Sequence, residues 1–293
     1  MNDSHFKYYL ALIASLILWG LSFPAMKYSF SFDKPLTIMF YRYTISFFII
    51  LPIFLFKFGD YVKEITDKKS ILFLGIFNFC GAFLQFIGVD KTSSTKSAII
   101  TQMLVIIVPI FAYFFLKERL NKKKLISIFI SFIGAIILST GLDFKDIFKN
   151  SSIIGDLLVM SGNFFWALYI IYTKKLTQKN SNFILLFSSI LTTVIVFIPI
   201  IFINSTIINI TKTGLGISFF LSLFCSIFPT LLYNFSLRKI EASTSAIIGP
   251  IEIISAVIVS YLFLGEKLNI IEISGGLLII ISFYMTASTS KYS

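Results

Sequence analysis

Residues 97–120 of this chain read SAIITQMLVIIVPIFAYFFLKERL, and residues 245–268 read SAIIGPIEIISAVIVSYLFLGEKL. Both stretches open with SAII and close on the pattern L-x-E-x-L, and they start 148 residues apart. Trp19 and Trp166 keep nearly the same register, 147 residues apart. A segment that recurs at a fixed period indicates an internal duplication. We therefore expect the chain to consist of two structurally equivalent halves.

The two halves, residues 1–142 and 151–293, are both strongly apolar. Hydrophobic residues make up 57% of the chain and charged residues 13%, which excludes a soluble globular domain. The apolar residues form runs of about twenty, long enough as helices to cross a hydrocarbon core of about 30 Å, and the runs lack the alternation of a membrane strand. The expected spans are 8–26, 36–56, 71–88, 97–116, 125–141, 153–173, 183–203, 214–235, 242–264 and 270–287.

Each half holds five of these spans, and five is an odd number. The second half must then enter the membrane from the side opposite to the first. The expected fold is an all-α polytopic membrane protein with ten transmembrane helices arranged as two inverted five-helix repeats. Transporters with inverted repeats commonly bind substrate near the bilayer midplane, between the repeats.

The chain has a net charge of +11, and its basic residues are unevenly distributed among the expected loops. With the N-terminus inside, inner segments carry 16 lysines and arginines, outer loops carry 8, and Arg42 lies within a span. Basic residues concentrate in cytoplasmic loops. The distribution predicts an integral protein of the cytoplasmic membrane with both termini in the cytoplasm, and it makes a nucleic-acid partner improbable. The oligomeric state is left open, with a monomer acceptable.

Several short motifs occur in order along the chain and resemble the EamA branch of the drug/metabolite transporter superfamily. The residues that carry the resemblance are GDLL at 155–158, then Trp166, Ala167 and Tyr169, the helix ends LKERL and LGEKL, and Glu252 placed 14 residues before Glu266. The resemblance covers essentially the whole chain. It implies ten helices with cytoplasmic termini, a central cavity, and export of amino acids or other small metabolites.

The prolines of the duplicated spans depart from the family pattern. The family often has a proline directly after the glutamate, whereas this chain has Ile253 there and Pro250 two residues before the glutamate. The first copy has Pro109, nearer the end of the span. We expect the helix breaks to move accordingly.

Arg42 and Glu252 are the ionisable residues that we place deep within the hydrocarbon. A charge at that depth is costly and normally faces the protein interior or water, together with a partner. We expect Glu252 to lie on a central cavity with Arg42 as its nearest cationic neighbour. The pair is interpreted either as a substrate or proton site or as a static ion pair that fixes packing.

Uncharged polar and aromatic residues within the spans supply further candidates for substrate contacts. Each amide could instead hydrogen-bond a neighbouring helix, and aromatic residues near span ends, including Tyr43 and Tyr233, more often anchor the interface. The complete set of candidate substrate-binding residues is Trp19, Arg42, Asn78, Gln85, Gln102, Asn163, Trp166, Tyr169, Asn234 and Glu252.

Glu118 and Glu266 stand at the ends of the two duplicated spans, each followed by a cation. We interpret both as solvated helix-end charges with local ion pairs, in preference to a gating role.

Signals for enzymatic chemistry and for direct ATP use are absent from the sequence. It contains no G-x-x-x-x-G-K-[ST] loop, the single histidine is His5, and Cys80 and Cys225 occur singly. These features predict no catalytic residues, no metal and no cofactor. The remaining hypothesis is a secondary transporter that exports small polar metabolites, amino acids first among them, by alternating access, with protons as the candidate coupling ion. The alternatives are a multidrug exporter, a membrane receptor or scaffold that does not transport, and an intramembrane enzyme.

Overall fold

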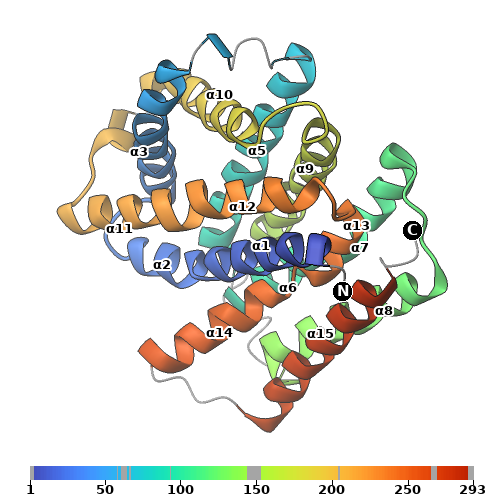
Figure 1. Ribbon diagram of the computed structural model, residues 1–293. Helices are drawn as coiled ribbons and strands as arrows, with labels where there is room; N and C mark the ends of the chain where they lie inside the picture. The colour runs from blue at the N-terminus through green and yellow to red at the C-terminus, as the bar shows by residue number, and fades with distance from the viewer. Residues whose placement is uncertain are drawn as a thin grey trace.

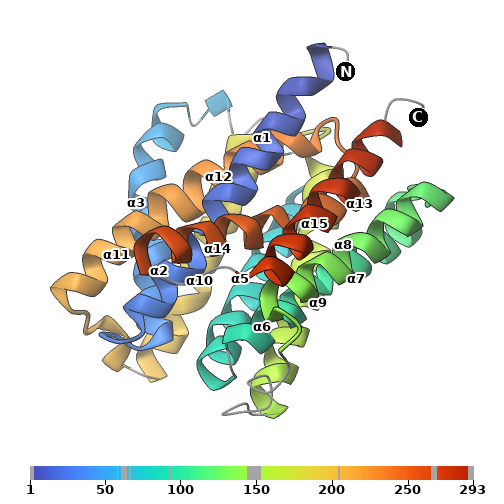
Figure 2. The same ribbon diagram turned by 90° about the horizontal axis from the view of Figure 1, so that it is seen from below.

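The computed structural model of the chain describes residues 3–57, 59–60, 65, 67–92, 94–143, 153–203, 205–264 and 269–289. Over these residues the chain forms helices and no strand. Figure 1 shows long helices packed around a common centre, and Figure 2 shows both termini at the same end of the molecule. We call that end the terminal face.

The first half of the chain supplies spans 1 to 5. Span 1 is α1 (Asp3–Gly20) followed by α2 (Ser22–Ser29), span 2 is α3 (Pro35–Phe56), and span 3 is α5 (Lys68–Lys91). Span 4 consists of α6 (Ser94–Gln102), α7 (Leu104–Phe111) and the π-helical turn η1 (Ala112–Leu116), and span 5 is α8 (Lys122–Thr140).

The second half supplies spans 6 to 10. Span 6 is α9 (Ile153–Leu176), and span 7 is α10 (Asn182–Ile203), which is followed by a short 3-10 turn η2 (Ser205–Ile208). Span 8 joins α11 (Lys212–Ser222), the π-helical turn η3 (Leu223–Ile227) and α12 (Phe228–Leu237). Span 9 is α13 (Ala242–Ile248) with α14 (Ile251–Leu264), and span 10 is α15 (Ile270–Thr289).

Length and composition make nine of the described helical segments able to cross a membrane, and the shorter apolar segment Ala242–Ile258 belongs to span 9. The expectation of an all-α polytopic membrane protein is confirmed. Three of the long helices begin at a polar residue whose side chain accepts a hydrogen bond from the first helical turn: Asp67 from Ser70 N, Asn121 from Lys124 N, and Thr211 from Gly214 N. Such caps satisfy backbone donors that the helix itself leaves free.

Helix packing relates the two halves by a pseudo-twofold exchange. Span 3 packs on span 6 (α5 on α9), and its image, span 8 on span 1, packs likewise (α12 on α1). Spans 2 and 7, 4 and 9, and 5 and 10 pack against their own counterparts, as α3 on α10, α7 on α13, and α8 on α15. With five spans in each half, equivalent helices run in opposite directions across the membrane, as inverted repeats require.

Spans 4 and 9 are both interrupted near their midpoints, but for different reasons. In span 9 the interruption lies at Gly249 and Pro250, and Pro250 has no N–H to donate to the preceding turn. In span 4 the interruption lies at Met103, whereas Pro109 sits inside α7 without ending it. The break in span 9 thus coincides with its proline, whereas the break in span 4 does not.

The two halves of spans 4 and 9 have different neighbours. At the terminal face α7 packs on α13, whereas α6 packs on α8 and α9, and α14 packs on α1 and α2. In Figure 1 α7 and α13 lie next to each other, while α14 runs away from them. Spans 4 and 9 thus meet towards the terminal face and diverge towards the other end.

Candidate functional site

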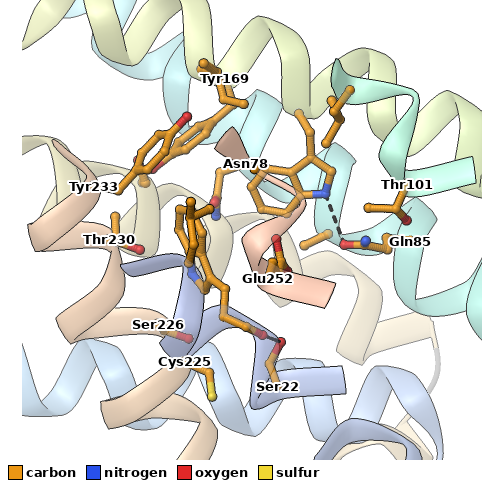
Figure 3. A pocket seen from close by; sticks show the side chains of 18 of the residues that line it. Ser22, Asn78, Gln85, Thr101, Tyr169, Cys225, Ser226, Thr230, Tyr233 and Glu252 are labelled. Atoms are coloured by element: carbon orange, nitrogen blue, oxygen red, sulfur yellow. Dashed lines mark hydrogen bonds between the residues drawn. The ribbon is translucent and has the colours of Figure 1, made fainter. Parts of the chain in front are cut away.

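A cavity of about 170 Å³ lies at the centre of the bundle. Its described lining comes from eight spans, namely 1 to 4 and 6 to 9, and includes no residue of α8 or α15. Figure 3 shows the side chains that surround it. The lining combines a carboxylate, a guanidinium, amides and hydroxyls with two tryptophans and many aliphatic side chains. A pocket of this kind, mainly apolar with a few polar groups, is typical of small-molecule sites.

Many lining residues occupy equivalent positions of the two repeats. The cavity is therefore built along the pseudo-twofold axis rather than within one half. The equivalent pairs, 147 or 148 residues apart, are Trp19 and Trp166, Ser22 and Tyr169, Arg42 and Ser189, Tyr43 and Ile190, Asn78 and Cys225, Phe86 and Tyr233, Thr101 and Gly249, and Leu104 and Glu252.

Glu252 lies in the first turn of α14 and faces the cavity. Figure 3 shows its carboxyl group among the lining residues, with Tyr169 and Tyr233 to one side and Gln85 and Thr101 to the other. Its side chain remains partly accessible. Among the described residues, none donates a hydrogen bond to the carboxylate or forms an ion pair with it, whereas the Glu252 main-chain oxygen accepts one from Ser255 Oγ at 2.8 Å.

The position of Glu252 depends on a close contact between α1 and α14. Ser255 Oγ also hydrogen-bonds Ile17 O of α1, at 3.2 Å. Gly20 ends α1 at this crossing, and a Cβ there would overlap both Ser255 Oγ and the Glu252 carbonyl oxygen. Glycine is required at position 20 because the backbones approach so closely.

Arg42 is 9% exposed and is held by span 8. Its Nε donates to Ser226 Oγ at 2.6 Å and its NH2 to Cys225 O at 2.5 Å, while NH1 faces Met26 Sδ at 3.8 Å. Cys225 O is free to accept because the residue four positions later is Pro229, which has no N–H to complete a helical hydrogen bond. The proline and the π-helical turn η3 together create the acceptor that Arg42 uses.

The expected ion pair between Arg42 and Glu252 is not formed in the described structure. The guanidinium is directed to the main chain and hydroxyl of span 8, and no contact of its N–H groups with Glu252 is found. Both residues nevertheless line the same cavity, and Cys225, whose carbonyl oxygen accepts a hydrogen bond from Arg42, lines it too. An acidic and a basic side chain therefore face one cavity without pairing with each other.

Eight of the ten candidate residues lie on the cavity: Trp19, Arg42, Asn78, Gln85, Gln102, Trp166, Tyr169 and Glu252. Asn163 and Asn234 are fully buried elsewhere. Asn163 Nδ2 donates to Ile100 O of α6 at 2.5 Å, and Asn234 Nδ2 donates to Asn182 O of α10 at 3.3 Å. Both amides join helices, which is the alternative that the sequence left open for them.

The two tryptophans occupy equivalent places but have different partners. Trp166 Nε1 donates to Gln85 Oε1 at 3.1 Å, and a Cβ at Gly81 would lie 3.1 Å from its indole ring. Trp19 packs on Tyr233, with 4.9 Å between the ring centroids. The indoles are thus fixed by neighbouring helices and present aromatic surface to the cavity.

Tyr43 and Tyr233 also line the cavity, although sequence reasoning favoured interface anchors for both. They are 6% and 3% exposed, and the Tyr233 hydroxyl lies 3.0 Å from Ser245 Oγ. Tyr233 and Phe86, 147 residues apart, occupy equivalent positions of the two repeats, and both line the cavity.

Glu118 does not have the solvated role expected of it. It is 8% exposed, and its carboxylate accepts hydrogen bonds from Ala242 N at 2.8 Å, Ser243 N at 2.9 Å and Ser243 Oγ at 2.6 Å. The end of span 4 in one repeat thus caps the start of α13 in the other, at the terminal face. A carboxylate at a helix N-terminus is favoured both by the free N–H groups and by the helix dipole.

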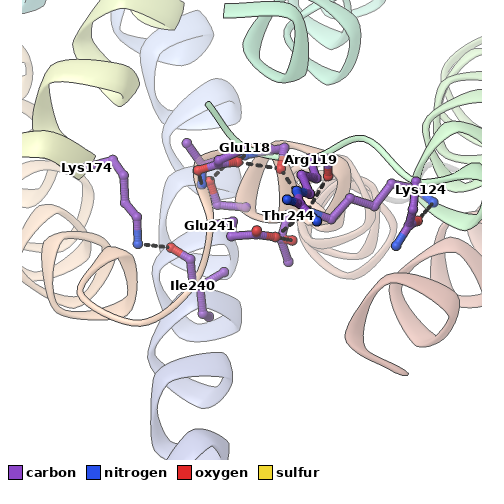
Figure 4. Close-up of polar contacts among 11 residues, drawn as sticks. Glu118, Arg119, Lys124, Lys174, Ile240, Glu241 and Thr244 are labelled. Atoms are coloured by element: carbon purple, nitrogen blue, oxygen red, sulfur yellow. Dashed lines mark hydrogen bonds and ion pairs between the residues drawn. The ribbon is translucent and has the colours of Figure 1, made fainter. Parts of the chain in front are cut away.

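Lysines complete the connections around this cap, as Figure 4 shows. Lys124, which is 4% exposed, forms an ion pair with Glu241, and Lys174 Nζ donates to Leu237 O at 2.7 Å and Ile240 O at 2.8 Å. The second-repeat counterpart of Glu118, Glu266, lies outside the described residues. Among the residues described, no group of three or more His, Cys, Asp or Glu side chains is arranged to hold a metal ion.

Two equivalent bundles of membrane-spanning helices, with a cavity between them that carries a few polar groups, form the architecture of a membrane transporter. The chain matches the EamA-like transporter family over residues 6–140 and again over residues 153–288, and it belongs to that family.

Similar proteins are found in bacteria and archaea. The chain is 24% identical over 293 residues to the uncharacterized transporter YyaM of Bacillus subtilis (strain 168), a match covering 97% of this chain and 94% of that protein. It is 25% identical over 302 residues to an uncharacterized transporter of Methanothermobacter thermautotrophicus, covering 94% and 85% of the two chains. One solved crystal structure is similar in fold, with a TM-score of 0.82 and 11% identity over 98% of each chain.

Proposed function

We propose that this membrane transporter is a secondary exporter of small polar metabolites, amino acids first among them, in the cytoplasmic membrane. The observation that carries the proposal is that a basic and an acidic side chain, Arg42 and Glu252, line one cavity without contacting each other. Buried charges of this kind are costly unless something else compensates them. A zwitterionic solute compensates both at once, because it offers a cation to one and an anion to the other.

The packing of spans 4 and 9 supports alternating access. They meet at the terminal face, where Glu118 bridges the repeats, and they diverge at the other end. An inverted pair of repeats reaches the opposite state by exchanging the conformations of its halves. With cytoplasmic termini, the described conformation is the one closed towards the cytoplasm. Reporter fusions after Lys123 and Lys291 should report cytoplasm, and a fusion after Lys149 should report the outer side.

A multidrug exporter is the second candidate function. Its substrates would need mainly apolar surface, and the cavity does contain Trp19, Trp166 and many aliphatic side chains. The amides Asn78, Gln85 and Gln102 on the same cavity favour a polar metabolite instead. Asn78 Nδ2 already donates to Thr193 Oγ1, and Gln85 Oε1 accepts from Trp166, but an apolar solute would offer no partner to the remaining amide groups.

Counterflow in proteoliposomes tests the proposal. Vesicles containing the purified protein are loaded with each of the twenty amino acids in turn, and exchange is measured with and without a pH gradient. We expect saturable exchange of a subset of amino acids, and an effect of the pH gradient if protons are coupled. Transport of lipophilic cations alone, with no amino acid exchanged, would contradict amino-acid export.

A further inference from the structure

The two charged residues of the cavity differ in how completely the protein satisfies them. Three nitrogens of Arg42 are directed to Ser226, Cys225 O and Met26, so the guanidinium has hydrogen-bond partners within the protein, although none of them is an anion. The carboxylate of Glu252 has no described donor. A carboxylate in a low-dielectric cavity gains more from a new cationic partner than an arginine that is already hydrogen-bonded gains from a new anion.

Aromatic side chains on the same cavity also favour a cationic ligand. Trp19 and Trp166 present indole surface to the cavity that Glu252 faces, and Tyr233 packs on Trp19. The faces of such rings attract cations, tryptophan most strongly, and the attraction increases when water is excluded. A carboxylate beside aromatic rings is therefore suited to an organic ammonium group.

We propose that Glu252 is the ammonium-binding residue of the cavity, and that a protonated amine is the group a substrate must carry. This inference rests on the proposed function, because it assumes that the cavity holds the transported solute. It also assigns different importance for binding to the two charged groups of an amino acid. The ammonium is indispensable, whereas the carboxylate contributes less because the protein already satisfies Arg42.

A hydrated inorganic cation is a poorer occupant of this position. Divalent ions take several oxygen ligands, commonly with more than one carboxylate, and the described residues hold no cluster of three or more acidic, histidine or cysteine ligands. The neighbouring aromatic and aliphatic surface would remain unfilled by a small ion but is covered by the carbon skeleton of an amine.

Matched analogues test the inference on the unmodified protein. Leucine, 3-methylbutylamine and 4-methylpentanoate share a carbon skeleton but keep both charged groups, only the amine, or only the carboxylate. Phenylalanine, 2-phenylethylamine and 3-phenylpropionate form a second set. In thermal-shift titrations and counterflow competition we expect the amine to act at concentrations within about threefold of those of its amino acid, and the acid to be weaker by at least about tenfold.

Glu252→Gln is the matching variant. It keeps the shape of the side chain but removes the negative charge, so stabilisation by the amine should fall at least about tenfold. Glu272→Gln serves as control, because Glu272 lies in the first turn of α15, away from the cavity, and accepts a hydrogen bond from Asn269 N at 2.9 Å. The control should bind amines like the unmodified protein. Size-exclusion profiles establish that both variants fold.

The outcomes separate this inference from the proposed function. The ammonium assignment is overturned, while amino-acid export stands, if amino acids exchange but the acids that lack an amine compete as well as the matched amines do. The same conclusion follows if Glu252→Gln keeps its preference for amines and loses only its response to a pH gradient. If amines bind through Glu252 but no amino acid exchanges, the ammonium assignment stands and amino-acid export fails. Absence of amine binding by the unmodified protein overturns the assignment.

Discussion

Glu118 and Glu252 both belong to the duplicated spans, yet their surroundings are opposite. Glu118, at the terminal face, accepts three hydrogen bonds from the start of α13. Glu252, at the cavity, accepts none from any described donor. A buried acid that accepts several hydrogen bonds stabilises a particular helix arrangement. An acid that faces a cavity without a protein partner leaves an interaction that a ligand or a proton can complete.

Exchanging the carboxylates for neutral groups should separate these roles, and this is the largest effect we expect on stability. Glu118→Ala leaves the N–H groups of Ala242 and Ser243 without acceptors, at a cost of about 2 to 4 kcal/mol. Glu252→Gln replaces an acid that has no described hydrogen-bond or ion-pair partner, and it should leave the melting temperature unchanged or raise it. Thermal unfolding in detergent, followed by size-exclusion chromatography, measures both. Equal destabilisation by the two variants would remove the distinction between them.

A smaller loss is expected when the α1–α14 crossing is disturbed. Gly20→Ala places a methyl group against Ser255 and the Glu252 carbonyl, so α14 must shift away from α1, at a cost of about 1 to 3 kcal/mol. Because Glu252 moves with α14, counterflow should fall as well.

Gly216→Ala is the matched control for that substitution. A Cβ at Gly216 has no described atom within 4 Å, and the residue lies within α11. Alanine is the better helix former, so stability should stay constant or rise by up to about 1 kcal/mol. If Gly20→Ala behaves like Gly216→Ala, the close approach of α1 does not position Glu252.

The sequence was sufficient for the helices and much of the cavity, because span length, the period of the duplication and the scarcity of polar residues are all local properties. It was insufficient wherever a partner comes from another span. Nothing in the sequence around Glu118 indicates that α13 begins beside it. Likewise, the Cys225 carbonyl can accept from Arg42 because of Pro229 and the π-helical turn in span 8, far from Arg42 in the sequence. The same limit explains Asn163 and Asn234, whose composition resembles that of the cavity amides but whose neighbours are main-chain carbonyls.

The backbone that carries Glu118 gives a third prediction, of opposite sign. Lys117 has φ 56°, in the left-handed region, and Glu118 N donates to Ala112 O at 3.2 Å. The second copy of the motif has Gly265 at the equivalent position. Lys117→Gly should therefore stabilise the protein by about 1 kcal/mol while keeping the Glu118 cap, because glycine adopts this conformation without steric cost. A fall in the melting temperature would show that the lysine side chain has a stabilising role of its own.

Asp67 extends the comparison to an acid that caps a helix and is partly exposed to solvent, and the effect expected there is the smallest. Its carboxylate accepts from Ser70 N at 3.0 Å and Ser70 Oγ at 2.6 Å, and these hydrogen bonds lower its pKa. A carboxyl whose pKa is lower in the folded state stabilises the protein above its unfolded pKa of 3.8 and loses that contribution as the pH falls through the folded value. Asp67→Asn should therefore make the melting temperature depend less on pH below about pH 4. Near neutral pH it should change the melting temperature less than Lys117→Gly does, because water replaces the lost interaction. The opposite result would be that Asp67→Asn lowers the melting temperature near neutral pH as much as Glu118→Ala does. The cost of removing a cap would then be set by the hydrogen bonds that it accepts from the helix start, and burial of the acceptor would not matter.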